Sequence, residues 1–107
     1  MAEPTLVEIF GAGASQSATA ITILKADLPG LTASATNTAE SLLAGIILKA
    51  AINLTPTNRD NNPDQSIAIE TGFDQIAYRG TTAYYQAARN ITLQKTNTAA
   101  TIDPDDY

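Results

Sequence analysis

The chain has 107 residues, with 6 Lys and Arg against 11 Asp and Glu and a net charge of −5. This length fits one domain that buries well over half of its unfolded surface, and the negative charge argues against nucleic acid and membrane surfaces as partners. The sequence contains no Cys and no His, which excludes disulfides, the usual zinc sites and His-assisted nucleophiles, so we expect no enzymatic activity, no cofactor and no metal.

The first third of the chain is predicted to hold two short strands. Residues 5–10 (TLVEIF) alternate partly between apolar and polar side chains, which is typical of a strand, and the glycine-rich residues 11–13 end it. Residues 20–24 (AITIL) form the second strand, and residues 27–30 contain a Pro-Gly turn. The acidic start has no uncharged apolar segment behind it, so we expect a protein made and used without export.

A helix is predicted over residues 39–53. Asn37 is placed to accept the first free backbone N–H groups, and Glu40 is placed to reach back in a capping box. The helix is apolar nearly all round, since its polar or small side chains form a single narrow stripe. That stripe consists of Ser41, Gly45, Lys49 and Asn53. Such a helix must be covered on more than one side, and Thr55-Pro56 is expected to end it.

The second half of the chain is predicted to form mainly strands. Residues 55–65 form a polar loop with two prolines, and residues 66–70 form a third strand. Residues 73–79 form a fourth strand, residues 80–82 a turn, and residues 84–95 a longer fifth strand.

These elements predict an α+β fold, with a small, mainly antiparallel sheet of about five strands and one largely buried helix. One small sheet can cover only one side of the helix. Either the sheet curls around the helix or a neighbouring chain completes the core. We therefore expect a homo-oligomer or a protein that docks on a larger assembly.

The C-terminal residues 99–107 are predicted to form an extended acidic tail beside a body of residues 1–98. This tail is too polar to order itself, so we expect a partner to hold it. The predicted partner-interface residues of the tail are Ile102, Asp103, Pro104, Asp105, Asp106 and Tyr107. The acids are suited to Arg or Lys on another chain. The composition leaves open whether Tyr107 and the aspartates grip that partner or follow where Ile102 and Pro104 are anchored.

Tyrosine and arginine alternate in a second segment. Tyr84, Tyr85 and Arg89 are predicted interface residues, with Tyr78 and Arg79 nearby. In a basic protein this pattern would indicate single-stranded nucleic acid. In an acidic chain it favours a protein–protein contact, where Tyr and Arg are enriched, over nucleic acid, and tyrosines that merely cover a sheet surface are the alternative.

Three further motifs are incomplete. Residues 11–13 resemble the start of a dinucleotide fingerprint, but neither the third glycine nor the helix follows. Alternate oxygen-bearing residues resemble the first half of a calcium loop: Asp60, Asn62 and Asp64. The Gly and Glu that such a loop requires further on are missing, so a solvated turn is preferred. Glu70 and Asp74 are both carboxylates, but glycoside hydrolysis needs a cleft with aromatic side chains around such a pair.

The chain as a whole resembles small structural proteins of tailed bacteriophages, particularly those infecting cyanobacteria. The likeness is spread over residues 1–11 (MAEPTLVEIFG), 36–42 (TNTAESL) and 102–107 (IDPDDY). The resemblance implies a virion component assembled in the host cytoplasm, above all a capsid cement or decoration protein that binds the major capsid protein or other virion proteins. It supplies no functional motif from which site residues could be carried over.

Two alternatives to a cement protein remain. The first is a tail-tube, tail-terminator or neck ring protein, since rings often exchange β-hairpins and residues 73–95 could supply one. The second belongs to another class, a small-molecule or carbohydrate-binding module, which would require a pocket.

Overall fold

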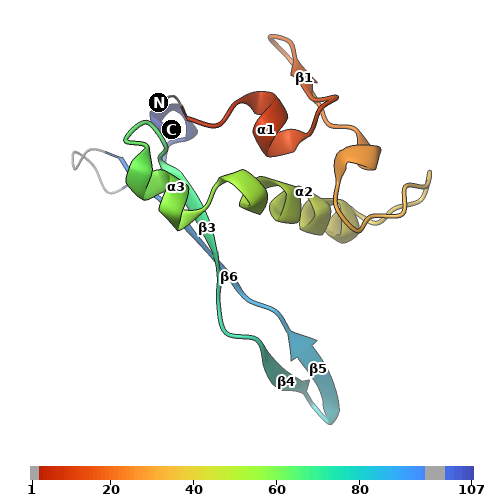
Figure 1. Ribbon diagram of the computed structural model, residues 1–107. Helices are drawn as coiled ribbons and strands as arrows, with labels where there is room; N and C mark the ends of the chain where they lie inside the picture. The colour runs from red at the N-terminus through yellow and green to blue at the C-terminus, as the bar shows by residue number, and fades with distance from the viewer. Residues whose placement is uncertain (1–2, 96–100) are drawn as a thin grey trace.

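The protein has an α+β fold, and the computed structural model describes residues 3–95 and 101–107. Short helices and a small hairpin form a body, and a long antiparallel ribbon projects from it (Figure 1). The helical elements are α1 (Leu6–Phe10), η1 (Lys25–Asp27), α2 (Ala39–Asn53), α3 (Pro56–Asn61) and η2 (Pro104–Asp106). The strands are β1 (Ser15–Gln16), β2 (Ile21–Thr22), β3 (Ile67–Thr71), β4 (Gln75–Arg79), β5 (Thr82–Gln86) and β6 (Arg89–Leu93).

The prediction of a strand over residues 5–10 is wrong, because this segment forms α1. A complete capping box starts the helix: the Thr5 hydroxyl accepts the Glu8 N–H at 3.2 Å, and the Glu8 carboxylate accepts the Thr5 N–H at 3.0 Å. These reciprocal bonds satisfy backbone donors at the helix start. Ile9 packs against the core beneath, so local capping and tertiary packing together outweigh the strand-like composition.

The second predicted strand is present but shorter. Only Ile21–Thr22 of residues 20–24 form β2, which pairs antiparallel with β1. β1 lies within residues 12–19, which are nearly all small. Two residues on each side make a minimal hairpin, which adds little to the core.

Helix α2 has the predicted bounds, but its cap and its burial differ from the prediction. Thr38 is the N-cap and accepts the Ser41 N–H at 3.1 Å. Asn37 instead accepts the Ser34 N–H in the preceding turn. Of the helix residues, Gly45 and Ala50 are buried. Exposed large apolar side chains remain on it: Leu43, Leu48 and Ile52. The prediction of a largely buried helix is therefore wrong for a single chain.

The polar loop predicted over residues 55–65 contains a short helix, α3. Thr55 caps it by accepting the Asn58 N–H at 3.1 Å, and Pro56 occupies its first turn. Proline is favoured there because the first N–H groups of a helix have no internal acceptor. The pair predicted to end α2 therefore also begins the next helix. The side chain of the buried Gln65 then ties this segment to β3 by donating to the carbonyls of Thr55 and Ile67.

The C-terminal strands form a ribbon rather than one sheet. β3 pairs antiparallel with β6, and β4 pairs antiparallel with β5. The long strand predicted over residues 84–95 is divided into β5 and β6. With β1 and β2, the described residues thus form six strands in three two-stranded sheets, instead of one sheet of about five.

A β-bulge joins the two halves of the ribbon. Thr71 pairs with Arg89 on the inner side, and Gln75 pairs with Gln86 on the outer side. Three residues, 72–74, therefore lie opposite two, 87–88. The Gly72 N–H still donates to the Ala88 carbonyl at 2.8 Å, so the two strands stay joined through this region. One extra residue on one strand is the defining property of a bulge.

The hydrophobic core is small and lies where α1, α2 and the root of the ribbon meet. Its buried residues are Ala50, Leu54 and Ile69, with Ile9 and Ile67 among the partly buried ones around them. The radius of gyration is 16.1 Å, whereas a compact domain of this length has about 13 Å. The accessible surface is 7743 Å² for 11.2 kDa, whereas a compact monomer of that mass exposes about 5700 Å². The chain alone is therefore elongated and under-packed.

Candidate assembly interface

The distal hairpin, defined as residues 75–86 (β4, β5 and their turn), carries large apolar side chains on one face. Because directly paired residues in an antiparallel ladder point to the same side, Ile76 and Tyr85 share this face with Tyr78 and Ala83. The side chain of Ile76 is 58% exposed, and those of Tyr78 and Tyr85 are each 70% exposed. We call this side the apolar face of the ribbon.

The opposite face of the distal hairpin is more polar. It carries the pairs Gln75–Gln86, Ala77–Tyr84 and Arg79–Thr82. The Arg79 guanidinium lies 4.9 Å from the centre of the Tyr84 ring, a cation–π contact. The two tyrosines predicted as interface residues thus point to opposite sides, and Tyr84 is engaged by its own hairpin.

The bulge keeps the apolar face continuous from the root of the ribbon to its tip. In β3 the odd-numbered Ile67 and Ile69 pair with Leu93 and Ile91, and Ile69 is buried against α2. After the extra residue, the even-numbered positions of β4 take over that side, beginning with Asp74. The side that packs on α2 at the root therefore continues to the tip, where its large side chains are exposed. Figure 1 shows the distal hairpin projecting beyond α2.

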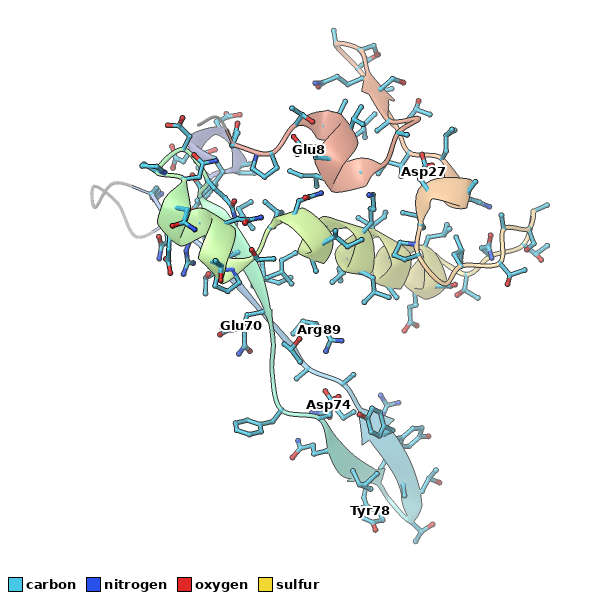
Figure 2. All side chains as sticks on the ribbon, viewed as in Figure 1. Glu8, Asp27, Glu70, Asp74, Tyr78 and Arg89 are labelled. Carbon is cyan, nitrogen blue, oxygen red and sulfur yellow. The ribbon has the colours of Figure 1, made fainter. Side chains whose placement is uncertain are left out.

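Contacts across the bulge support this continuity. The Tyr85 hydroxyl donates to Asp74 Oδ2 at 2.7 Å, and the Ala88 N–H donates to Asp74 Oδ1 at 3.3 Å. Arg89 Nη1 lies 3.9 Å from Asp74 Oδ1 and donates to the Ala88 carbonyl at 2.8 Å. One carboxylate thus joins the outer hairpin to the inner ribbon. Arg89, a predicted interface residue, lies at this joint (Figure 2).

These contacts shift two pKa values in opposite directions. The hydrogen bond from Tyr85, the Ala88 N–H and the charge of Arg89 lower the pKa of Asp74 from its ordinary value of 3.8. The hydrogen bond to Asp74 and its negative charge raise the pKa of Tyr85 from 10.0. Both shifts favour the ionised carboxylate with the neutral phenol at neutral pH.

A groove of about 360 Å³ opens where the ribbon diverges from α2. One wall comes from α2 and the other from the ribbon just inside the distal hairpin. Its lining residues are Ala44, Ile47, Leu48, Ala87 and Arg89. The walls are mostly aliphatic, with one guanidinium at the rim. The groove therefore suits an apolar or aromatic side chain.

The described part of the predicted tail, residues 101–107, contains the single turn η2 and is bound by its own chain. Lys95 Nζ donates to Asp106 Oδ2 at 2.8 Å and to the Thr101 carbonyl at 2.7 Å. Asp103 caps the turn by accepting the Asp105 N–H at 3.0 Å. The large apolar side chain of Ile102 stays exposed. The predicted boundary between residues 98 and 99 lies outside the described residues.

The two groups of predicted interface residues lie far apart. Residues 101–107 lie at the end of the molecule away from β4 and β5 (Figure 1). The tail and the distal hairpin are therefore separate surfaces.

Sequence reasoning did not find the role of Lys95 in binding the tail, although a cation close in sequence to three aspartates is a signal that could have indicated it.

The remaining motifs have structural explanations. A side chain at Gly13 would collide with Leu24, and the Gly13 N–H donates to Asp27 at 2.9 Å, so this glycine permits close packing. The Asn62 side chain accepts the Asp64 N–H at 3.2 Å, as in an ordinary Asx turn. In residues 3–95 and 101–107, no group of three acidic side chains is arranged to hold a metal ion.

The carboxylates predicted as a possible pair are separated by the bulge. Glu70 pairs with Asn90 on the side of the ribbon opposite the apolar face. Asp74 follows the extra residue and points to the apolar face. Figure 2 shows Glu70 and Arg89 on opposite sides of the strands.

None of the helices in the described residues has the length and apolarity needed to cross a bilayer. Comparison with protein-family models, curated proteins and solved structures finds no match to this chain.

Proposed function

We propose that this chain is a non-catalytic structural protein of a phage virion, a capsid cement or decoration protein that binds the major capsid protein and stabilises the head shell. The observation that carries the structural role is the projecting ribbon, whose apolar face continues past α2 with no cover from the body. The proposal that the assembly is a phage virion rests on the resemblance of the sequence to small virion proteins.

The ribbon has the properties of an element that a neighbour must support. An isolated two-stranded hairpin is at best marginally stable in water, and its unpaired edges invite further pairing. The distal hairpin exposes Ile76, Tyr78 and Tyr85 on one side. Burying an aliphatic or aromatic side chain of this size yields about 1.5–3 kcal/mol. A neighbour that covers the hairpin therefore stabilises both the hairpin and the contact.

The total surface is consistent with this role. The excess over a compact monomer is roughly 2000 Å², which lies in the range buried by permanent protein complexes. The distal hairpin and the tail lie at opposite ends of the molecule. A body placed over a joint between capsid subunits can thus reach one subunit with the ribbon and another with the tail.

The experiment that tests this function is the composition of purified virions. Mass spectrometry with labelled peptide standards gives the copy number of this chain relative to the major capsid protein. A cement protein approaches the copy number of the capsid protein, and its removal lowers the temperature at which heads release DNA. Absence of the chain from virions would contradict the proposal.

The ring alternative is favoured by one observation, the projecting hairpin itself. Head-to-tail rings can close by placing such an arm on the next subunit. A tail-tube, tail-terminator or neck ring protein would be present in far fewer copies than the capsid protein. The same measurement of copy number therefore separates the two virion roles.

A small-molecule or carbohydrate-binding module is the alternative from another class. The groove beside α2, at about 360 Å³, falls at the lower end of the size range of ligand pockets. A ligand-shift screen on the purified protein tests this alternative. A compound that raises the melting temperature strongly, and loses its effect in Leu48→Glu, would favour it over the structural role.

A further inference from the structure

We propose that the groove between α2 and the ribbon is the docking site for the distal hairpin of a second copy of this chain. This inference rests on the proposed function, which requires a neighbouring molecule to cover the ribbon, and it identifies one such neighbour. The apolar face of one hairpin would lie against Ile47 and Leu48 of the other copy. The partner is thus a copy of the same chain, and the contact is the exchange of an arm.

The chemistry of the two surfaces matches. The groove has small alanine side chains on both walls, Ala44 and Ala87, which leave room for a ring, and aliphatic side chains on α2. The distal hairpin presents two phenol rings and an isoleucine on one side. Arg89 at the rim can stack on an inserted tyrosine ring while its neighbour Asp74 balances its charge.

The hairpin cannot reach the groove of its own chain. Ala87 lines the groove, and the turn at Gly80 lies seven residues further along the strand. At about 3.3 Å per residue, this places the tip roughly 23 Å from the groove wall along a hydrogen-bonded ribbon. Folding back would require breaking the ladder between β4 and β5. The occupant therefore comes from another molecule.

The area is sufficient when the exchange is reciprocal. Burying two tyrosines and one isoleucine removes about 150–250 Å² for each aromatic side chain, and the groove wall loses a comparable area. Two arms docked in two grooves then bury on the order of 1500–2000 Å² in total, which is the area of a standard stable interface. Each chain would contribute half of this area, which is less than its excess of roughly 2000 Å² over a compact monomer of this mass.

Charge also permits the contact. The distal hairpin contains Arg79 as its one charged residue, whereas the chain as a whole has a net charge of −5. The one charged residue that lines the groove, Arg89, lies beside Asp74, so an arm with a single charge meets little of the repulsion expected between two copies of an acidic protein.

Cross-linking between two single-cysteine variants tests the proposal, because the chain has no cysteine of its own. Ile76→Cys places a thiol on the apolar face, and Leu48→Cys places one in the groove. The two purified proteins, distinguished by a mass tag, are mixed and treated with a short bismaleimide. We expect a heterodimer cross-linked between these positions. The matched control is Gln75→Cys, which lies one residue away on the opposite face of the same strand.

A second pair of variants fills the groove. Ala44→Trp occupies the space that the hairpin would enter, whereas Ala39→Trp adds the same ring to an exposed position in the first turn of α2. We expect Ala44→Trp to shift the protein at least tenfold towards monomer in sedimentation velocity, with the circular dichroism of the wild type. Ala39→Trp is expected to keep the association of the wild type.

Three results would overturn the proposal. These are a monomeric wild-type protein at the cross-linking concentration, equal cross-linking of Leu48→Cys to Gln75→Cys and to Ile76→Cys, and equal association of the two Trp variants. If a protein that gives one of these results is present in virions at full copy number, the function stands and the arm docks elsewhere. If the cross-link between positions 76 and 48 forms and purified virions lack this chain, the exchange of arms is upheld and the virion role is rejected.

Discussion

The hydroxyl of Tyr85 donates to Asp74 across the bulge at 2.7 Å, so a side chain of the outer hairpin is bound to a residue at the joint. Arg89, on the inner ribbon, approaches the same carboxylate at 3.9 Å. The bend of the ribbon is therefore fixed by side chains as well as by backbone pairing. This joint sets the direction in which the apolar face of the distal hairpin points.

Tyr85→Phe is expected to raise the pKa of Asp74 towards its ordinary value of 3.8, because the largest contribution to its lowering comes from the phenol hydrogen bond. The carboxyl carbon shift of Asp74, followed by NMR over pH, measures this change. Tyr78→Phe, on the same face of the hairpin, is the control and should leave the titration of Asp74 unchanged. An unchanged midpoint in Tyr85→Phe would contradict the role of the hydroxyl.

The joint is also expected to loosen at both ends of the pH scale. The pKa of Asp74 is lowered, so its contribution to stability is present above the ordinary pKa and is lost as pH falls through the lowered value. The pKa of Tyr85 is raised, so its contribution is present below 10 and is lost as pH rises through the raised value. Amide exchange of Ala88, whose N–H donates to Asp74, should accelerate at low pH beyond the intrinsic rate.

Lys95→Gln is expected to release the tail without unfolding the body. The ion pair with Asp106 is partly exposed, so the loss in the free energy of unfolding should be below about 1 kcal/mol. Limited proteolysis should cleave residues 101–107 several-fold faster than in the wild type. Lys49→Gln, on α2, is the control for a lost cation. Equal cleavage in the two variants would show that Lys95 does not hold the tail.

Deletion of residues 99–107 is expected to leave a folded body that no longer enters virions. The core of Ala50, Leu54 and Ile69 does not include the tail, so the thermal transition should stay within a few degrees of the wild type. Quantification of the truncated protein in purified particles is the measurement. Normal incorporation would remove the assigned role of the tail and would leave the ribbon as the attachment surface.

Thr5→Ala is expected to melt α1, because it removes the acceptor of the Glu8 N–H and one half of the capping box. Loss of an N-cap costs about 1 kcal/mol, and the pKa of Glu8, which its bonds to Thr5 lower, should rise. Faster amide exchange of Gly11, which donates to Val7 at the end of α1, reports the melting. Thr36→Ala, in the exposed turn before α2, is the control.

The sequence predicts the fold class and, approximately, the strands over residues 66–70 and 73–79, but it misses α3 and the division of the last predicted strand into β5 and β6. The bounds of α2 follow from its long apolar run. Its narrow polar stripe indicates that other residues or another chain must cover it on more than one side. Residues 5–10 are predicted wrongly because their β-branched and aromatic side chains indicate a strand, whereas the bonds between Thr5 and Glu8 require only a local spacing of three. Such a short helix depends on packing that a pattern does not reveal.

The candidate site is only partly predictable. Tyr85 and Arg89 are recognised as interface types by composition, but their joint at Asp74 depends on register across two strands. One signal was present: the apolar positions change from odd to even between Ile69 and Ile76, and this change of phase indicates an extra residue. The direction of the arm and the groove beside α2 are tertiary properties without a local signature.

The bulge makes the number of residues in segment 72–74 more important than their side chains. Phe73 is 92% exposed, so replacing its side chain should leave the ribbon unchanged. Removing the residue altogether would leave two residues opposite 87–88 and restore an even ladder, so the bend and extra twist of the bulge would be lost while Ile76 and Tyr85 stayed on the same side. A single-codon deletion at this position would therefore change the direction in which the recognition surface projects from the body while every contacting side chain was still present.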